Sequence, residues 1–247
     1  MLIHGYAQER VTTFGLQVKP IIPSTLLRTG ATSLNQNNAD YVVDHLPGYS
    51  FGGVIRIGLN NRFSVESGIS YVRRNFESSV QHYDQLFSDT VGYRIIGYEI
   101  PVTGLVFVRL SDQIYMNTAF GLAFDMFPSD VSNFNSAEFV ALGTRTGIEG
   151  SNIFPWLKVG LTANVGFEYR TKEKGYFYLG ASYHRPFGAI YDVVHIYDRP
   201  GAFDKATLQL SGNYLTVDFK YFFHEEPKEK KVKRDPDTMP SWMKAGN

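Results

Sequence analysis

The sequence contains no cysteine among its 247 residues. Disulfide bonds, thiolate nucleophiles and thiolate metal sites are therefore excluded. An excess of charge of one sign is also lacking, because 24 basic residues are balanced by 24 acidic ones. The composition thus gives no reason to expect nucleic acid or a charged membrane surface as a partner.

Long apolar runs are missing as well. No stretch approaches the roughly 18 to 20 apolar residues that a transmembrane helix requires, which excludes a helical membrane protein. The first ten residues, MLIHGYAQER, have small residues near Ala7 but lack the charged start and most of the apolar core of an export signal. Residues 1–10 are therefore either a signal-peptide remnant or an ordinary flexible N-terminus.

The sequence shows instead a strict alternation of apolar and polar residues. In LKVGLTANVGFEYR, Leu157, Val159 and Leu161 share one face, and the residues between them share the other. A period of two predicts a β-strand. Eight segments follow this pattern, with no convincing helix, and they lie at residues 11–19, 49–59, 63–73, 92–110, 114–126, 156–170, 176–187 and 207–223.

The links between these segments alternate in length. Short links of turn-forming residues lie at 60–61, 111–113 and 171–175, and long ones at 20–48, 75–91, 127–155 and 188–206. In an up-and-down barrel this order places the short turns at one rim and the long loops at the other. It predicts an all-β fold for residues 11–223, an eight-stranded antiparallel transmembrane barrel with short periplasmic turns, extracellular loops and periplasmic termini.

The polar faces of the strands carry many charges. A soluble barrel or sandwich would place its apolar face inside, so the charged face predicts a lumen and the apolar face predicts contact with lipid. With eight strands the interior is just wide enough for side chains to fill it, and the charges should pair across it. A structural plug and a narrow proton or ion path both remain open. The predicted lumen residues are Lys19, Arg56, Glu66, Arg74, Glu99, Arg109, Asp125, Lys158, Glu168, Arg170, His184, Asp218 and Lys220.

Aromatic residues gather near the ends of the apolar faces. This grouping predicts two belts at the lipid interfaces. The general preference of aromatics for strands explains their number but not their positions. The predicted interface residues are Tyr49, Phe51, Phe63, Trp156, Phe167, Tyr169, Phe177, Tyr183, Tyr221 and Phe223.

The last segment breaks its own alternation. Leu208 and Leu210 have the opposite parity to Leu215 and the apolar residues that follow it. Either a bulge near residues 211–212 restores the pattern, or the first part of the segment projects beyond the membrane.

Three stretches resemble a known family. YEIPVTGLVFVRL after a long link, FSVESGISYVRRNF, and the aromatic end VDFKYFF are similar to strands of the PorT-like, or outer-membrane β-barrel, domain family of Bacteroidota. The resemblance covers most of residues 11–223. It implies a location in the outer membrane of a Gram-negative bacterium rather than an activity, and a few members of the family belong to secretion or gliding machinery.

The hypothesis of an enzyme depends on Ser182 and His184. They lie two residues apart on one face of a strand, as a nucleophile and a base would in a lipid-modifying enzyme. The sequence places no carboxylate to orient the histidine, so we expect an inward-facing structural histidine and no enzyme. Calcium-loop spacing is also missing, and we expect neither a metal nor another cofactor.

The composition changes abruptly at His224. Residues 224–247, HEEPKEKKVKRDPDTMPSWMKAGN, mix both charges with three prolines and cannot form another strand. Met239, Pro240, Trp242 and Met243 nevertheless supply apolar anchors near the end. The alternatives are a flexible tail and a periplasmic segment that folds on a protein partner.

Together these patterns predict a non-enzymatic structural or accessory subunit of an envelope complex, in contact with membrane lipid and with one or more proteins. The alternatives are a lipid-modifying enzyme and a narrow channel through the charged lumen.

Overall fold

The computed structural model describes residues 12–60, 62–134, 138–146, 154–171, 174–199 and 202–223. Its elements are β1 (Thr12–Ile22), η1 (Leu26–Arg28), β2 (Thr32–Gln36), β3 (Ala39–Gly58), β4 (Phe63–His82), β5 (Phe87–Arg109), β6 (Ile114–Met126), β7 (Val131–Phe134), β8 (Phe139–Arg145), β9 (Leu157–Arg170), β10 (Tyr176–Pro186), β11 (Tyr191–Arg199), β12 (Ala202–Leu210) and β13 (Tyr214–Phe222). Among the described residues, no helix has the length and apolar character needed to cross a membrane.

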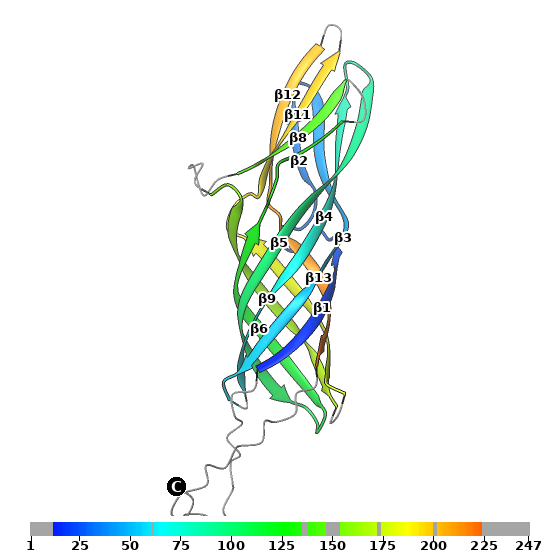
Figure 1. Cartoon of the computed structure of the whole chain (residues 1–247). Helices are drawn as coiled ribbons and strands as arrows, with labels where there is room; N and C mark the ends of the chain where they lie inside the picture. Colours follow the sequence, from blue (N-terminus) through cyan, green and yellow to red (C-terminus); the bar gives the residue numbers. More distant parts are fainter. Residues whose placement is uncertain are drawn as a thin grey trace, which may run out of the picture.

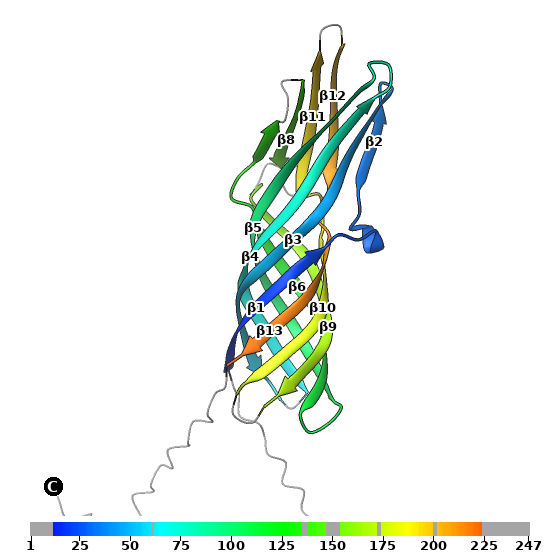
Figure 2. The same ribbon diagram turned by 90° about the vertical axis from the view of Figure 1, so that its right-hand side faces the viewer.

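Eight of these strands close into a barrel (Figures 1 and 2). They follow the order β1-β13-β10-β9-β6-β5-β4-β3, and β3 pairs with β1 again. The closing pair is antiparallel and extends from Thr12 opposite Ile57 to Ile21 opposite Gly48. Closure removes the free edges that an open sheet would expose.

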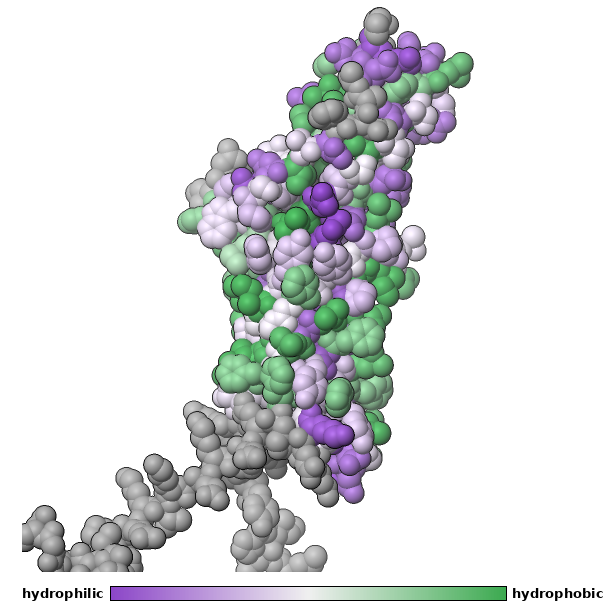
Figure 3. Space-filling view, turned by 45° about the vertical axis from the view of Figure 1, so that its right-hand side comes forward, coloured by the Kyte–Doolittle hydropathy of each residue, from purple (hydrophilic) through white to green (hydrophobic). Residues whose placement is uncertain are grey.

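The outer wall of the barrel is apolar. On β1, Phe14, Leu16 and Val18 are exposed, whereas the alternate residues Gln17 and Lys19 are buried. Figure 3 shows hydrophobic side chains gathered over the lower half of one face, with hydrophilic ones at the upper tip. An apolar outside with a polar inside is the arrangement of a membrane-spanning barrel. The structure therefore confirms the predicted eight-stranded transmembrane fold.

The strands do not stop at the barrel. β3, β4 and β5 continue upward, joined by β2, and a second sheet with the order β12-β11-β8-β7 stands beside them (Figure 2). We call this β-structure above the barrel the upper body. Side-chain hydrogen bonds connect its two sheets. Asn133 donates to the carbonyl of Gly92, and Gln36 donates to the carbonyl of Lys205.

The upper body has an apolar core, as a soluble β-protein does. Large rings such as Tyr41, Phe127 and Tyr191 are almost completely buried in it. The core comprises Ala39, Tyr41, Val43, Phe76, Val80, Val91, Ile95, Phe127, Phe139, Ala141, Ile190, Tyr191, Val193, Ala206, Leu208 and Leu210. The apolar side chains therefore point outward in the barrel and inward in the upper body.

Much of the predicted loop structure is in fact strand. The link 75–91 was expected to be a long loop, but β4 continues to His82 and the turn occupies only 83–86. The reason is that the apolar residues of β4 move from odd positions in the barrel to even positions in the upper body. On β4 the odd residues Val65 and Ile69 face outward in the barrel, whereas the even residues Phe76 and Val80 are buried in the upper body. A strand predicted from apolar alternation therefore ends too early, at the point where the surroundings change from lipid to water.

On β3 the backbone itself changes face. Its pairing with β4 shifts register between Leu46 and Tyr49. Above this irregularity the odd residues Tyr41 and Val43 are buried, and below it the even residues Val54 and Arg56 are buried. β3 contains one extra residue there, because it advances three residues from Leu46 to Tyr49 while β4 advances two, and a single extra residue exchanges the faces.

The last predicted strand is two strands. β12 ends at Leu210 and β13 begins at Tyr214, with Gly212 between them in the left-handed region at φ 69°. The expected bulge within one strand is therefore wrong, and the alternative of a projecting upper part is correct. Leu208 and Leu210 have the opposite parity because they belong to the core of the upper body.

A buried histidine lies in this core. The His195 ring stacks against Phe139 and Tyr41, with both ring centroids 5.6 Å away, and neither of its nitrogens has a hydrogen-bond partner among the described residues. Burial lowers the pKa of His195 from 6.5 to about 4. The neutral imidazole is therefore the form that the folded upper body accepts.

This burial predicts that acid loosens the upper body. The folded pKa lies below the unfolded one, so stability is complete above about pH 6.5 and declines toward pH 4, by about 3 kcal/mol. Hydrogen exchange of the β11 amides, corrected for intrinsic rates, should show lower protection at pH 4.5 than at pH 7. In His195→Phe, which retains the stacking, most of this difference should disappear. An equal loss in both proteins would contradict the assignment to His195.

Candidate functional site

The lower part of the lumen is centred on Arg56 of β3. Its guanidinium lies 3.0 Å from Glu66 of β4 and 2.5 Å from Glu168 of β9, so it bridges two strands on different sides of the barrel. The Phe222 ring lies against the same guanidinium, 3.9 Å from its central carbon. Lys220 donates to Glu66. All four charged side chains are nearly inaccessible to solvent, so the group is fully paired within the lumen.

A second group surrounds Asp218 of β13. Ser182 and Thr216 donate hydrogen bonds to its carboxylate, and Asn164 donates another at 2.9 Å. Lys19 lies 3.9 Å from the same carboxylate. The Asp218 charge is therefore compensated mainly by neutral donors rather than by one close cation.

The third group lies at the top of the barrel. Nε2 of His184 is 2.7 Å from Asp125, and Nδ1 is 3.3 Å from Glu99. Arg74 contacts the other oxygen of Asp125 at 3.2 Å, and Tyr214 donates to Glu99. Tyr214 also stacks on the imidazole, with centroids 4.7 Å apart. The two carboxylates are thus held by one imidazole, one guanidinium and one phenol.

These residues fit a cation poorly. One atom each from Glu99, Asp125 and His184 lies within 4.8 Å of the others, a spacing that a metal ion requires. The two nitrogens of His184 face different carboxylates, however, and Arg74 already neutralises Asp125. A metal ligated by this imidazole would have to displace one of these contacts. Hydrogen bonds of His184 Nε2, Arg74 and Tyr214 already hold these carboxylates, and Nδ1 of His184 makes no hydrogen bond among the described residues.

The predicted lumen set is distributed unevenly. Arg109 is a correction, because its side chain is 60% exposed and pairs with Asp112 in the adjacent turn. It lies at the end of β5, where the lumen opens to the short-turn rim. Arg170 lies at the same rim and reaches back to Glu168 at 2.6 Å. Lys158 is buried at the opposite end, across the ladder from Asp125.

Ser182 and His184 do not form a pair. Ser182 bonds to Asp218, whereas His184 contacts Asp125 and Glu99. A carboxylate does orient the histidine, contrary to the expectation from sequence, but the hydroxyl beside it has a different partner. Both side chains are buried in the lumen.

Most of the predicted interface aromatics point outward. The structure leaves eight of them exposed, while Tyr183 and Tyr221 are half-buried. Three tyrosines of the set donate hydrogen bonds near the rims. Tyr169 donates to Gln113, Tyr221 to the carbonyl of Lys174, and Tyr183 to the carbonyl of Leu27. The exposed eight are Tyr49, Phe51, Phe63, Trp156, Phe167, Tyr169, Phe177 and Phe223.

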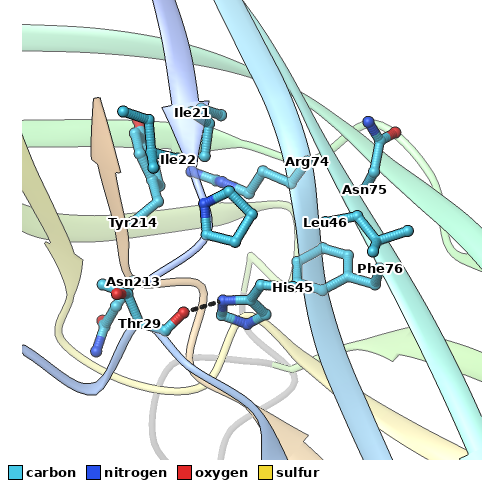
Figure 4. Close-up of a pocket in the computed structure, with 11 residues that line it drawn as sticks. Ile21, Ile22, Thr29, His45, Leu46, Arg74, Asn75, Phe76, Asn213 and Tyr214 are labelled. Atoms are coloured by element: carbon cyan, nitrogen blue, oxygen red, sulfur yellow. Dashed lines mark hydrogen bonds between the residues drawn. The ribbon is translucent and has the colours of Figure 1, made fainter. Parts of the chain in front are cut away.

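A small hollow marks the junction of barrel and upper body (Figure 4). It lies where β1 ends and β13 begins, with His45, Arg74 and Tyr214 among its lining residues. Nδ1 of His45 donates to the carbonyl of Thr29 at 2.5 Å. The enclosed space is that of about one water molecule. The hollow is therefore a packing feature and too small for an organic ligand.

Several network residues were not predicted from the sequence. Tyr178, Asn164 and Gln17 are neutral, so a search for inward charges passes over them. Tyr178 donates to Asn164 at 2.7 Å and Gln17 donates to Ser70 at 2.8 Å. Their inward parity was the signal that could have identified them. The predicted anchors Met239, Pro240, Trp242 and Met243, and residues 1–10, lie outside the described residues.

Comparison with known proteins identifies no family. No family model matches the sequence, and no curated protein matches it either. The resemblance to the PorT-like family therefore depends on the quoted strands alone and stays a prediction.

Several solved structures of outer-membrane proteins can be superimposed on most of this chain. The outer membrane protein OprG from Pseudomonas aeruginosa is 13% identical, with 87% of this chain and 96% of that chain covered and a TM-score of 0.49. The outer membrane protease OmpT from Escherichia coli is 9% identical, with 86% and 96% covered and a TM-score of 0.42. The outer membrane protein W from Escherichia coli is 12% identical, with 88% and 100% covered and a TM-score of 0.34. At these scores the likeness assigns no function to the present chain.

The Arg56 group gives a direct test of the lumen. Arg56→Met should lower the free energy of unfolding by about 2 to 3 kcal/mol, because it removes the hydrogen-bonded cation that Glu66 and Glu168 share and leaves Lys220 and Arg170 as their remaining partners. Arg109→Met is the matched control, since the exposed Arg109 side chain should change stability by less than about 0.5 kcal/mol. Urea unfolding in detergent, followed by the heat-dependent gel mobility of folded barrels, measures both. Equal effects would show that the buried pairs do not support the barrel.

Proposed function

We propose that this chain is a non-enzymatic protein of the outer membrane, a structural or accessory subunit of an envelope complex. In this proposal the short turns and both termini lie in the periplasm, and the upper body stands outside the cell. The observation that carries it is the combination of a filled lumen with an upper body that is built on uninterrupted barrel strands.

The filled lumen argues for anchorage rather than transport. Glu66, Glu168 and Asp125 each have a guanidinium or ammonium partner within the barrel. Above them the rings of Phe127 and Tyr214 lie against the Arg74 guanidinium and connect the charges to the apolar core of the upper body. Paired charges below and packed rings above favour a plug over a water-filled path.

The length of the strands argues for display. β4 and β5 contain 20 and 23 residues, about twice the roughly 9 to 11 residues that cross a bilayer. The surplus forms a body with its own core, raised above the membrane on a rigid scaffold. Recognition surfaces in proteins are commonly carried in this way. Participation in secretion or assembly machinery, which the family resemblance implies, is compatible with such a design.

The periplasmic part of the proposal rests on residues 224–247. Met239, Trp242 and Met243 are the apolar anchors that would seat this segment on a partner. A segment of mixed charge that orders on binding can act as a tether between the barrel and a periplasmic protein.

A pull-down from native outer membrane in mild detergent tests the subunit role. The intact chain should retain a defined partner, truncation after His224 should abolish its recovery, and Trp242→Ala should reduce it at least tenfold. Lys230→Ala, a charge change in the same segment, is the control and should leave recovery unchanged. Recovery of the protein alone in every case would overturn the tether.

Planar-bilayer recordings test the sealed lumen and with it the channel alternative. The purified chain should give no reproducible unitary conductance, because the paired charges and the overlying core fill the interior. A porin reconstituted in the same way provides the positive control. Steps of constant size that scale with salt concentration would establish an open path instead.

A further inference from the structure

The lipid-facing wall carries two parallel rows of large side chains near the short-turn rim. The strand register places the members of each row directly beside one another across β1, β13, β10, β9 and β6. The row nearer the rim consists of Leu16, Tyr221, Phe177, Tyr169 and Ile114. The second row consists of Val18, Phe219, Leu179, Phe167 and Met116.

A groove runs between the two rows. The residues between them, including Gln17, Lys220, Tyr178 and Glu168, point into the lumen and are buried, so the backbone of these strands forms the floor. Nine of the ten row residues line the hollow, which has a volume of about 580 Å³. It is far larger than the hollow at the junction with the upper body.

The dimensions of the groove select its occupant. Residues two apart on a strand are about 6.8 Å apart, which limits the width between the rows. A helix with side chains is about 10 Å across and does not fit between them. Five strands spaced about 4.8 Å apart give a length of about 19 Å. That length is close to the thickness of one leaflet, about 15 Å of hydrocarbon, when the chain lies at a tilt.

The chemistry of the walls agrees with the dimensions. The hydroxyls of Tyr221 and Tyr169 are directed to acceptors in the short turns, so the polar ends of these rings lie toward the rim and away from the groove. The rest of the wall is aliphatic or aromatic, with Leu16, Phe219 and Leu179 all about half exposed. A ligand with polar groups would find no hydrogen-bond partner there.

We propose that this groove is a binding site for a single acyl chain of a membrane phospholipid, in the leaflet on the short-turn side. The headgroup of that lipid lies at the level of the Tyr169 and Tyr221 hydroxyls. The site holds one lipid more tightly than the rest of the apolar wall because a chain in the groove contacts both rows and the backbone between them at once.

Native mass spectrometry of the full chain tests the site. The protein is delipidated in mild detergent and titrated with palmitoyl-oleoyl phosphatidylethanolamine, with palmitate as competitor. The wild type should retain one lipid through conditions that strip the others, and palmitate should displace it because the chain is what is recognised. Lack of displacement by palmitate would show headgroup binding and overturn the acyl-chain site.

Two variants alter the groove in opposite ways. Leu179→Trp fills it and Phe167→Ala removes part of its wall, and each should reduce the retained one-lipid population at least tenfold. Leu122→Trp, on the exposed wall outside the groove, should leave that population unchanged. Heat-dependent gel mobility verifies that each variant is folded, and either groove variant alone suffices. Equal retention in the folded groove variants and the control would refute the proposal.

Discussion

The bond network of Arg56 with Glu66 and Glu168 is the interaction on which the barrel depends. Strands that face lipid on one side have only the lumen in which to place polar side chains, and charges in a narrow lumen persist only when they are paired. Through Glu168, Arg56 joins β3 to β9, which are not neighbours in the barrel, so it bridges the lumen as well as neutralising charge. The His184 group repeats this solution with Arg74 and Asp125, whereas the Asp218 carboxylate is held mainly by neutral donors.

The upper body answers a different requirement. Outside the bilayer the surroundings are aqueous, and the same strands must bury apolar side chains instead. β4 makes the change through its sequence, from Glu66 inside the barrel to Phe76 inside the upper body, and β3 makes it through an irregular backbone. The polar lumen of the barrel and the apolar core of the upper body therefore result from one rule applied on two sides of a boundary.

The sequence predicted the barrel because its alternation is strong where one face meets lipid. It did not predict the extent of β3, β4 and β5, because the reversal of apolar parity at the boundary resembles the end of a strand. The inward face was predicted correctly for Arg56 and Glu168. Arg109 is the last residue of β5, too near the rim for its side chain to be enclosed. Contact partners escaped prediction altogether, because they depend on register around the closed sheet. The division of Ser182 and His184 between two clusters is an example.

The continuity of β3, β4 and β5 from the barrel into the upper body has a mechanical meaning. The β4–β5 ladder keeps one register across the boundary and β3 crosses it as one strand with a shifted register, so these strands join the upper body to the barrel without a loop between them. Its height above the bilayer and its inclination are set by the tilt of the barrel strands. A molecule that lands on its tip meets a surface whose position is already determined, and little orientational freedom remains to be lost on contact.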